Sequence, residues 1–366
     1  MRILAIETSC DETAAAVVED GTKLLSNVVA SSVDLHAAYG GVVPEIAARS
    51  HIESILPVVD SALHTAFQGP SLETVFQGRT LELWDGIDAI AGTYGPGLGG
   101  SLLIGVLTAR TLAIAKNKPL YAVNHVEAHV YANFLTDTDL PNYKLPPAPP
   151  AFPLLALIVS GGHTQLVLFK DHFDYRVLGQ TGDDAVGEAF DKVAKILGLP
   201  YPGGPSVSRE AEKGDPSSVK LPKARLDSPY DYSFSGLKTA VLRAAQQMAG
   251  KDFTFPSTEL SAVLTDTQKA DLAASFQATA ISTLADGLQA AIRDHSPKSV
   301  VIAGGVAANQ ALRQAAARLT PAPIYTDIKL CTDNAAMIAT QAYYQASHKR
   351  PTTDPYTLGI EPGLQM

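Results

Sequence analysis

The sequence predicts an α/β protein built from two duplicated lobes, and three observations lead to this prediction. The chain has 366 residues, of which 46% are apolar and 18% are charged, so it is long enough for two domains and apolar enough to fold. Apolar strand patterns alternate with helical patterns along the chain. A segment near the amino terminus also recurs about halfway along, at a constant offset of 151 residues.

The repeat relates residues 4–20 to residues 155–171. The identical positions are Leu4/Leu155, Ala5/Ala156, Ser9/Ser160, Thr13/Thr164 and Asp20/Asp171. Each copy has the pattern of an apolar strand, a small polar turn and a second apolar strand. Because the offset is almost half the chain, we expect two related lobes whose polar turns face one ligand cleft.

The elements that follow the first hairpin are indicated by their caps and periods. We expect a helix over 45–66, because Pro44 suits a first helical position and apolar residues recur with the helical period. Pro57 should kink this helix. Asn124 can cap a helix that starts after it. Between these points the pattern predicts a strand at 87–93, a glycine turn at 95–100, a helix at 101–116 and a strand at 120–123.

A loop with six prolines at 136–153 is the best domain boundary. We therefore expect a first lobe of residues 1–135 plus 335–366 and a second lobe of residues 136–334. Residues 200–236 should be rich in loops. The remaining pattern predicts helices at 185–197, 237–249, 269–294 and 309–319, a strand at 299–303, and a last helix at 334–346 that returns to the first lobe.

Composition excludes several classes of protein. The most apolar stretch, 102–115, is shorter than the roughly 20 residues that a membrane span needs and contains Arg110. The amino terminus becomes acidic at Glu7, which disfavours a secretory signal or a basic transit peptide. The two cysteines lie far apart and form no disulfide framework. A net charge of -9 disfavours a protein that coats nucleic acid, and we expect a cytoplasmic protein with no membrane partner.

His125 and His129 are the sharpest chemical signal. Their spacing places both imidazoles on one face of a helix, one turn apart, where they can bind one metal ion. The alternative is a pair of exposed surface histidines. A zinc protease of the HExxH type would need a glutamate directly after the first histidine. Val126 holds that place, and Glu127 projects about 200° away, so protease chemistry is disfavoured.

Glycine turns form the second signal. Gly95, Gly97 and Gly100 match GxGxxG, but the next strand ends in Asn124 rather than in the acidic residue that a dinucleotide site requires. What remains is a turn that can hold an anion at a helix start.

Further glycine pairs at 161–162, 203–204 and 304–305 together suggest a backbone cradle for a nucleotide. Asp11, Glu12, Asp191 and Asp333 are acidic residues at or near these turns, and a buried or capping role is the alternative for each.

The chain resembles the TsaD family of tRNA threonylcarbamoyladenosine transferases, once called the glycoprotease family. The motifs run in family order over nearly the whole chain. They are Ile6-Glu-Thr-Ser-Cys-Asp-Glu-Thr13, His36-Ala-Ala-Tyr-Gly-Gly-Val-Val-Pro-Glu45, Gly95-Pro-Gly97, His125-Val-Glu-Ala-His129, Val159-Ser-Gly-Gly-His-Thr-Gln165, Gly187-Glu-Ala-Phe-Asp-Lys192, Tyr201-Pro-Gly-Gly-Pro205, Ser233-Phe-Ser-Gly-Leu-Lys238, Ala303-Gly-Gly-Val-Ala-Ala-Asn309 and Cys331-Thr-Asp-Asn334.

The resemblance implies the two-lobed actin, Hsp70 and sugar-kinase fold. It also implies transfer of a threonylcarbamoyl group from threonylcarbamoyl-adenylate to N6 of the adenosine next to the anticodon, in tRNAs that read codons beginning with A, with release of AMP. The implied partners are tRNA and the proteins TsaB and TsaE.

The resemblance also implies site residues. His125, His129 and Asp333 would bind one divalent metal ion, iron or zinc. The adenine nucleotide or the adenylate would be held by Ile158, Val159, Ser160, Gly161, Gly162, Asp191, Gly204 and Asn309. Asp11 or Glu12 is our candidate for accepting the proton or for placing metal or water.

Departures from the family are insertions. Residues 66–85 carry two Phe-Gln-Gly triplets, and 136–153 and 250–268 look longer than usual. Two alternatives from other classes remain: an ATPase or small-molecule kinase of the same fold, and a non-catalytic scaffold like TsaB. The TsaB type lacks the histidine pair, so His125 and His129 count against the scaffold.

Overall fold

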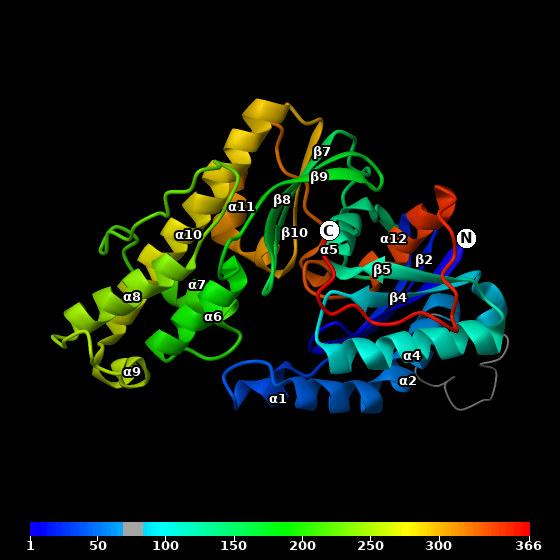
Figure 1. Cartoon of the computed structure of the whole chain (residues 1–366), viewed down its shortest axis with the longest axis horizontal. Coiled ribbons are helices and arrows are strands. Elements are labelled where there is room, and N and C mark those ends of the chain that lie inside the picture. Colours follow the sequence, from blue (N-terminus) through cyan, green and yellow to red (C-terminus); the bar gives the residue numbers. More distant parts are fainter. Residues whose placement is uncertain (69–82) are drawn as a thin grey trace. The chain divides into compact units, whose positions relative to one another are not determined.

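The computed structural model describes residues 1–68 and 83–366, and its internal contacts divide the chain into two compact units (Figure 1). Unit 1 comprises Met1–His36, Val42–Pro150 and Tyr325–Met366, and unit 2 comprises Ala37–Gly41 and Ala151–Ile324. Gly69 and the second Phe-Gln-Gly triplet, at 76–78, lie outside the described residues.

Unit 1 is built on a sheet that places the first predicted hairpin at its centre. In the described residues the strand order is β5-β4-β1-β2-β3-β6, with β1 antiparallel to β2 and parallel to β4. The strands are β1 (Arg2–Glu7), β2 (Glu12–Glu19), β3 (Lys23–Ser31), β4 (Ala89–Gly95), β5 (Leu120–Asn124) and β6 (Asp137–Thr138).

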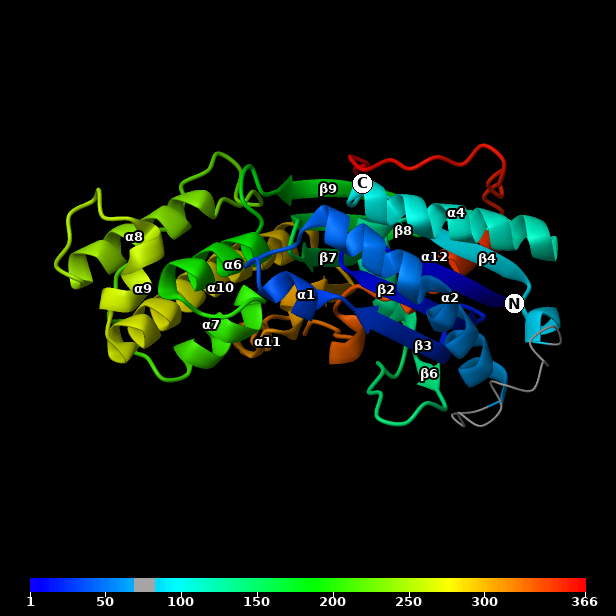
Figure 2. The ribbon, with the colours of Figure 1, turned by 90° about the horizontal axis from the view of Figure 1, so that it is seen from below.

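Alternate residues of β1 enter two different cores, as the twofold period of a strand requires. Leu4 and Ile6 pack with residues of α2 (Pro44–Gln68) and α4 (Gly99–Lys116). Ile3 and Ala5 pack with α12 (Ala335–Ser347) on the other face of the sheet. Figure 2 shows α2 and α4 in front of this sheet. The sheet is thus covered on both faces by helices.

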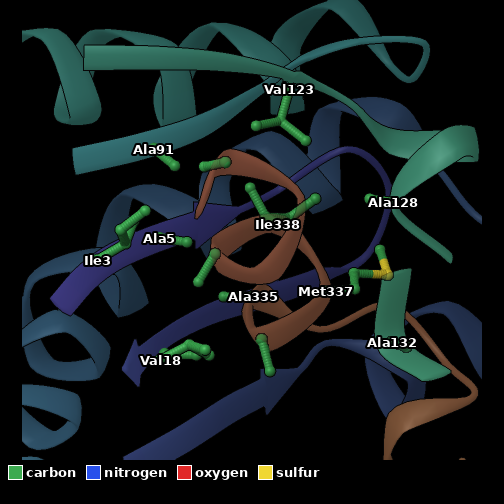
Figure 3. Packing of buried hydrophobic residues seen from close by; sticks show 14 of the residues in the cluster. Ile3, Ala5, Val18, Ala91, Val123, Ala128, Ala132, Ala335, Met337 and Ile338 are labelled. Atoms are coloured by element: carbon green, nitrogen blue, oxygen red, sulfur yellow. The ribbon is translucent and has the colours of Figure 1, made fainter. Parts of the chain in front are cut away.

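Helix α12 fills the second of these cores. Figure 3 shows Met337 and Ile338 of α12 against Ile3 of β1, Val123 of β5 and Ala128 of α5 (His125–Tyr131). This packing confirms that the last predicted helix returns to the part of the chain that holds the first hairpin. It also brings the residues just before α12 next to α5.

Unit 2 repeats the arrangement with a smaller sheet. The strand order in the described residues is β10-β7-β8-β9, with β7 parallel to β10 and antiparallel to β8. Its elements are β7 (Leu154–Val159), β8 (Thr164–Asp171), β9 (Asp174–Gln180), α6 (Val186–Leu197), α7 (Gly203–Ala211), α8 (Ser235–Met248), α9 (Leu260–Val263), α10 (Asp266–His295), β10 (Ser299–Ala303) and α11 (Gln310–Ala316).

The two hairpins share one register, which confirms the predicted duplication. Leu4 pairs with Val17 in unit 1, and Leu155 pairs with Leu168 in unit 2. Both pairs are related by the same offset, since 155 − 4 = 151 and 168 − 17 = 151. In each unit the first strand also has a parallel neighbour on its other edge, β4 or β10.

Some sequence expectations need correction. Residues 203–211 form α7 rather than loop, and the helix expected at 309–319 spans only Gln310–Ala316. The sequence signal misled at α7 because Gly203, Gly204 and Pro205 are typical of turns, although proline and glycine are tolerated in the first turn of a helix. Helix α2 continues through Pro57, and a kink there stays a prediction.

The contact-based units also differ from the predicted lobe boundaries. Residues 136–150 and 325–334 belong to unit 1. One reason is local pairing, since β6 pairs with β3 and the amide of Lys144 donates to Asp327. Asp333 therefore lies in the same unit as the histidine pair, although the predicted division assigned it to the other lobe.

Helix α4 is long and apolar enough, by length and composition alone, to cross a membrane, a test that core helices of soluble proteins also pass. Its residues Val106, Ala109 and Ala113 are buried. The absence of a membrane span stays a prediction.

Candidate metal and nucleotide sites

Helix α5 presents the histidine pair as predicted. Asn124, the last residue of β5, caps the helix, because its side-chain oxygen accepts from the amides of Val126 and Glu127. The rings of His125 and His129 lie edge to face with centroids 4.8 Å apart, and both side chains are buried. The alternative of two exposed surface histidines is therefore wrong.

Asp333 completes a group of three possible ligands. Its Oδ1 lies 3.4 Å from Nε2 of His125 and 3.4 Å from Nε2 of His129, and the three ligand atoms lie within 4.8 Å of one another. Two ligands about 2.1 Å from a tetrahedral ion are about 3.4 Å apart. Within the described residues both ring nitrogens of His129 are buried without a hydrogen-bond partner. The donor set and its spacing fit a divalent metal ion.

The charges at the three side chains are strongly coupled. Burial alone would raise the pKa of Asp333, but the two imidazoles outweigh it and hold that pKa well below its usual range. Burial alone would lower the pKa of His125, but the carboxylates of Asp333 and Glu7 raise it well above its usual value. The site thus concentrates negative charge around two imidazoles, which favours a bound cation.

Glu7 supports His125 from behind. Its fully buried carboxylate accepts from Nδ1 of His125 at 3.0 Å, from the hydroxyl of Thr93 and from the amide of Ser9. Burial works against ionisation, yet His125 lowers the pKa of Glu7. An ionised carboxylate only accepts hydrogen bonds, so Nδ1 of His125 carries a hydrogen. Nε2, which faces Asp333, is then the ring nitrogen that can bind a metal ion after losing its own hydrogen.

Asp11 is the last residue of the turn between β1 and β2, and Glu12 is the first residue of β2. Burial raises the pKa of Asp11, and burial together with the charge of Asp11 raises the pKa of Glu12 to about 7. Ser31 donates to one oxygen of Glu12, while Oε2 is buried with no partner among the described residues. The negative charge of Asp333 also raises the pKa values of Asp11 and Glu12. Both carboxylates therefore interact electrostatically with the group formed by His125, His129 and Asp333. A carboxylate of this kind can accept a proton near neutral pH.

The corresponding turn of unit 2 is bare backbone. Ile158 and Val159 are fully buried in β7, so the exposed part of the predicted segment is Ser160, Gly161 and Gly162. The hydroxyl of Ser160 accepts from the amide of His163, which closes the turn. A Cβ added at Gly161 or Gly162 would meet no atom within 4 Å, so a ligand can approach the main chain there.

Asp191, Gly204 and Asn309 lie around helix α7 and the start of α11. Asp191 accepts from the amide of Gly203 at 2.7 Å, and a Cβ at Gly203 would collide with Asp191. Position 204 is open, with no atom within 4 Å of an added Cβ.

Asn309 uses its oxygen to cap α11 through the amide of Leu312. Its amide nitrogen donates at 2.9 Å to both Ser208 of α7 and Gln277 of α10. Asn309 therefore ties three helices together.

Sequence reasoning missed the residues that support these side chains. Glu7 gave one usable signal, a charged residue within an apolar strand. Ser208 and Gln277 gave none, since a serine or glutamine within a helix is ordinary.

Comparisons with known proteins find one family of similar sequences and several structures of similar fold. The family model described as TsaD, tRNA N6-adenosine threonylcarbamoyltransferase, matches residues 23–340. Curated proteins named tRNA N6-adenosine threonylcarbamoyltransferase are similar to this chain. That of Thermomicrobium roseum is 52% identical, over 94% of this chain and 92% of its own length. That of Moorella thermoacetica is 44% identical, over 100% of this chain and 97% of its own length.

Among solved structures, HypF of T. kodakarensis superposes with a TM-score of 0.58 at 13% identity, over 95% of this chain and 48% of that one. A full-length HypF gives a TM-score of 0.54 at 12% identity, over 96% and 56%. These likenesses support the fold alone.

Proposed function

The chain belongs to the TsaD family of tRNA N6-adenosine threonylcarbamoyltransferases, and from this premise we propose how its two groups of site residues divide the reaction. Membership decides for a transferase that acts on tRNA, with the actin, Hsp70 and sugar-kinase fold, over a kinase or a non-catalytic scaffold. The observation that carries the mechanism is the convergence of His125, His129 and Asp333 within 4.8 Å.

We propose that His125, His129 and Asp333 hold one divalent ion, Fe²⁺ or Zn²⁺. When bound, such an ion polarises a carbonyl as a Lewis acid. The need for it follows from the acceptor, since the lone pair of an exocyclic adenine amine is delocalised into the ring and attacks poorly. Neutral imidazole nitrogens and one carboxylate suit both candidate ions, and the tautomer that Glu7 imposes on His125 leaves the correct nitrogen free.

The turn of unit 2 is the proposed nucleotide holder. Bare backbone at Ser160–Gly162 and Gly204 can approach the phosphate and sugar of the adenylate closely, and Asp191 is placed beside it by the amide of Gly203. Fixing the donor relative to the acceptor can contribute about 7 to 11 kcal/mol to such a transfer. The hydrogen bonds of Asn309 support a positioning role for that residue.

Asp11 or Glu12 is the proposed proton acceptor, and Glu12 is favoured by its pKa of about 7 and its unpartnered oxygen. In the step, the adenosine N6 forms a bond to the carbamoyl carbon, and the bond from that carbon to the AMP oxygen breaks. The proton lost by N6 passes to the carboxylate, directly or through water.

The partners proposed are tRNA, TsaB and TsaE, and the protein is proposed to act in the cytoplasm. An apolar face supports a helical partner of the TsaB type. Ile52 and Leu56 are exposed on α2, and Leu103 and Leu107 are exposed on α4, which packs beside it. Each pair is four residues apart, the spacing of one helix face.

The test is direct. The purified chain, loaded with Fe²⁺ or Zn²⁺, is incubated with threonylcarbamoyl-adenylate, tRNA and the TsaB and TsaE proteins, and the tRNA nucleosides are analysed by mass spectrometry. We expect threonylcarbamoyladenosine with the unmodified sequence and none with the double variant His125→Ala/His129→Ala. Normal turnover by the metal-free double variant would end the metal proposal.

A further inference from the structure

Residues 353–365, which we name the strap, follow the edge of unit 1 where β4 and β5 lie. The amide of Thr353 donates to the carbonyl of Leu120 at the start of β5. At the other end, the amide nitrogen of Asn124 donates to the carbonyl of Gln365 at 3.3 Å. The strap therefore spans β5 from its first residue to the residue that caps the histidine helix.

One guanidinium, that of Arg110, anchors the middle of the strap. Arg110 of α4 donates from Nε to the carbonyl of Pro355, from Nη2 to that of Tyr356 at 2.8 Å and from Nη1 to that of Leu358 at 3.0 Å. Hydrogen bonds from a charged donor are about twice as strong as neutral ones. Three of them fix both the position and the direction of this stretch of backbone.

Beyond this anchor the strap closes over the glycine turn. The amide of Glu361 donates to the carbonyl of Tyr94 at 2.8 Å, and the amide of Gly97 donates to the carbonyl of Pro362 at 3.2 Å. An added Cβ at Gly95 would collide with the carbonyl of Glu361, and the nearest atoms it would meet all belong to the strap. Glycine is required at position 95 because the strap passes so close.

On its other side the glycine turn contacts Ser9, which in turn contacts His125. The amide of Leu98 donates to the carbonyl of Ser9 at 2.8 Å, and the hydroxyl of Ser9 lies 3.1 Å from Nδ1 of His125. Gly95 is also the register partner of Asn124, the cap of α5. Two routes thus lead from the strap to His125, one through Gly97 and Ser9 and one through Asn124.

We propose that the strap is a positioning element for the metal-binding histidine. Its contacts hold the glycine turn and Asn124 in the arrangement that orients the ring of His125. This inference rests on the proposed metal site. Displacing the strap should weaken metal binding even though no ligand is changed, because outer contacts that orient ligands typically account for about 10-fold to 100-fold in affinity.

The test uses Gly95→Ala, which pushes the strap outward, and Gly99→Ala as the matched control. A Cβ at Gly99 meets the same strap only at ordinary contact distance, 3.7 Å from Pro362 and 3.9 Å from Ile360. A third variant, Arg110→Lys, keeps the charge but replaces the planar fork, whose three nitrogens each reach a different carbonyl, with a single nitrogen. Zn²⁺ affinity is measured by competition with a chelator, and hydrogen exchange of peptides covering 353–365 is measured by mass spectrometry.

We expect Gly95→Ala and Arg110→Lys to speed exchange over 353–365 and to weaken Zn²⁺ binding by about 10-fold, with Gly99→Ala within about twofold of the unmodified chain. Faster exchange with unchanged Zn²⁺ affinity would overturn the inference. Unchanged exchange in both variants would also overturn it, because the contacts that define the strap would not be holding it. A failure of the unmodified chain to bind Zn²⁺ would instead refute the metal site itself.

Discussion

The substitution Glu7→Gln should weaken metal binding by His125, His129 and Asp333 without changing any of these three ligands. In the structure one carboxylate oxygen accepts from the amide of Ser9, and the other accepts from Thr93 and from Nδ1 of His125. Glutamine has the same shape but carries two donor hydrogens on one of these positions. Its amino group must face either the amide of Ser9, where two donors meet, or the ring of His125.

The size of the effect follows from these two choices. The first leaves buried donors unsatisfied, at about 1–3 kcal/mol. The second requires Nδ1 of His125 to accept, which moves the ring hydrogen to Nε2, the nitrogen that faces Asp333. That tautomer cannot bind a metal through Nε2. We therefore expect Zn²⁺ affinity to fall by about 10-fold to 100-fold, the range typical of outer partners of metal-bound histidine.

The assay is chelator competition for Zn²⁺, read beside thermal unfolding of the metal-free protein. Thr93→Val is the matched control, because it removes a donor to the same oxygen of Glu7 but leaves the tautomer of His125 unchanged. We expect Thr93→Val to lower the unfolding temperature and to change Zn²⁺ affinity much less than Glu7→Gln. Equal Zn²⁺ affinities for Glu7→Gln and the unmodified chain would refute the tautomer argument.

Three further predictions concern the other groups. If Glu12 accepts the proton, single-turnover rates should rise as pH increases through about 7, since only the ionised form is a base. Glu12→Gln should abolish this rise. A dependence of the rate on pH that Glu12→Gln leaves unchanged would point to Asp11 as the acceptor. Gln277→Ala should weaken binding of an adenine nucleotide, measured by calorimetry, by about 5-fold to 10-fold, because it removes one of the two acceptors that hold the amide of Asn309, at a cost of about 1 kcal/mol. Unchanged affinity would separate Asn309 from the nucleotide. Leu56→Asp should abolish co-purification with a TsaB-type partner and leave the Zn²⁺ affinity of the isolated chain unchanged. Retained co-purification would show that the partner does not bind at the exposed face of α2 and α4.

Local patterns were sufficient for the hairpins, the caps and the histidine pair. The helical spacing of His125 and His129 and the cap at Asn124 are properties of a few adjacent residues, so they are visible in the sequence. The role of Asp333 is different, because only the packing of α12 against β1 and β2 brings it beside α5. The family resemblance supplied that residue, whereas spacing could not.

The lobe boundary shows the same limit. A run of prolines at 136–153 marked a break in regular structure, but a break in structure need not separate two cores. The two-residue strand β6 and the contact of Lys144 with Asp327 keep the first part of this loop in unit 1. Such pairings join residues that are far apart in the sequence, 114 positions for Lys23 and Asp137 and 183 for Lys144 and Asp327, and no local pattern reports them.

The duplication gives a physical reason for the different tasks that we propose for the two turns. At the offset of 151, Glu7 corresponds to Ile158, Cys10 to Gly161 and Asp11 to Gly162. In unit 1 the turn carries carboxylates, and Glu7 lies behind a histidine, so the turn favours cations and protons. In unit 2 an apolar core residue replaces Glu7, a glycine replaces Asp11, and His163 stands at the position of Glu12. The turn there carries no carboxylate, and its two glycines leave backbone that can approach an anionic phosphate. Exchanging these characters, for example with Gly162→Asp, should therefore weaken nucleotide binding by charge repulsion while leaving Zn²⁺ affinity intact. Nucleotide affinity unchanged by this added carboxylate would show that the phosphate does not lie at this turn.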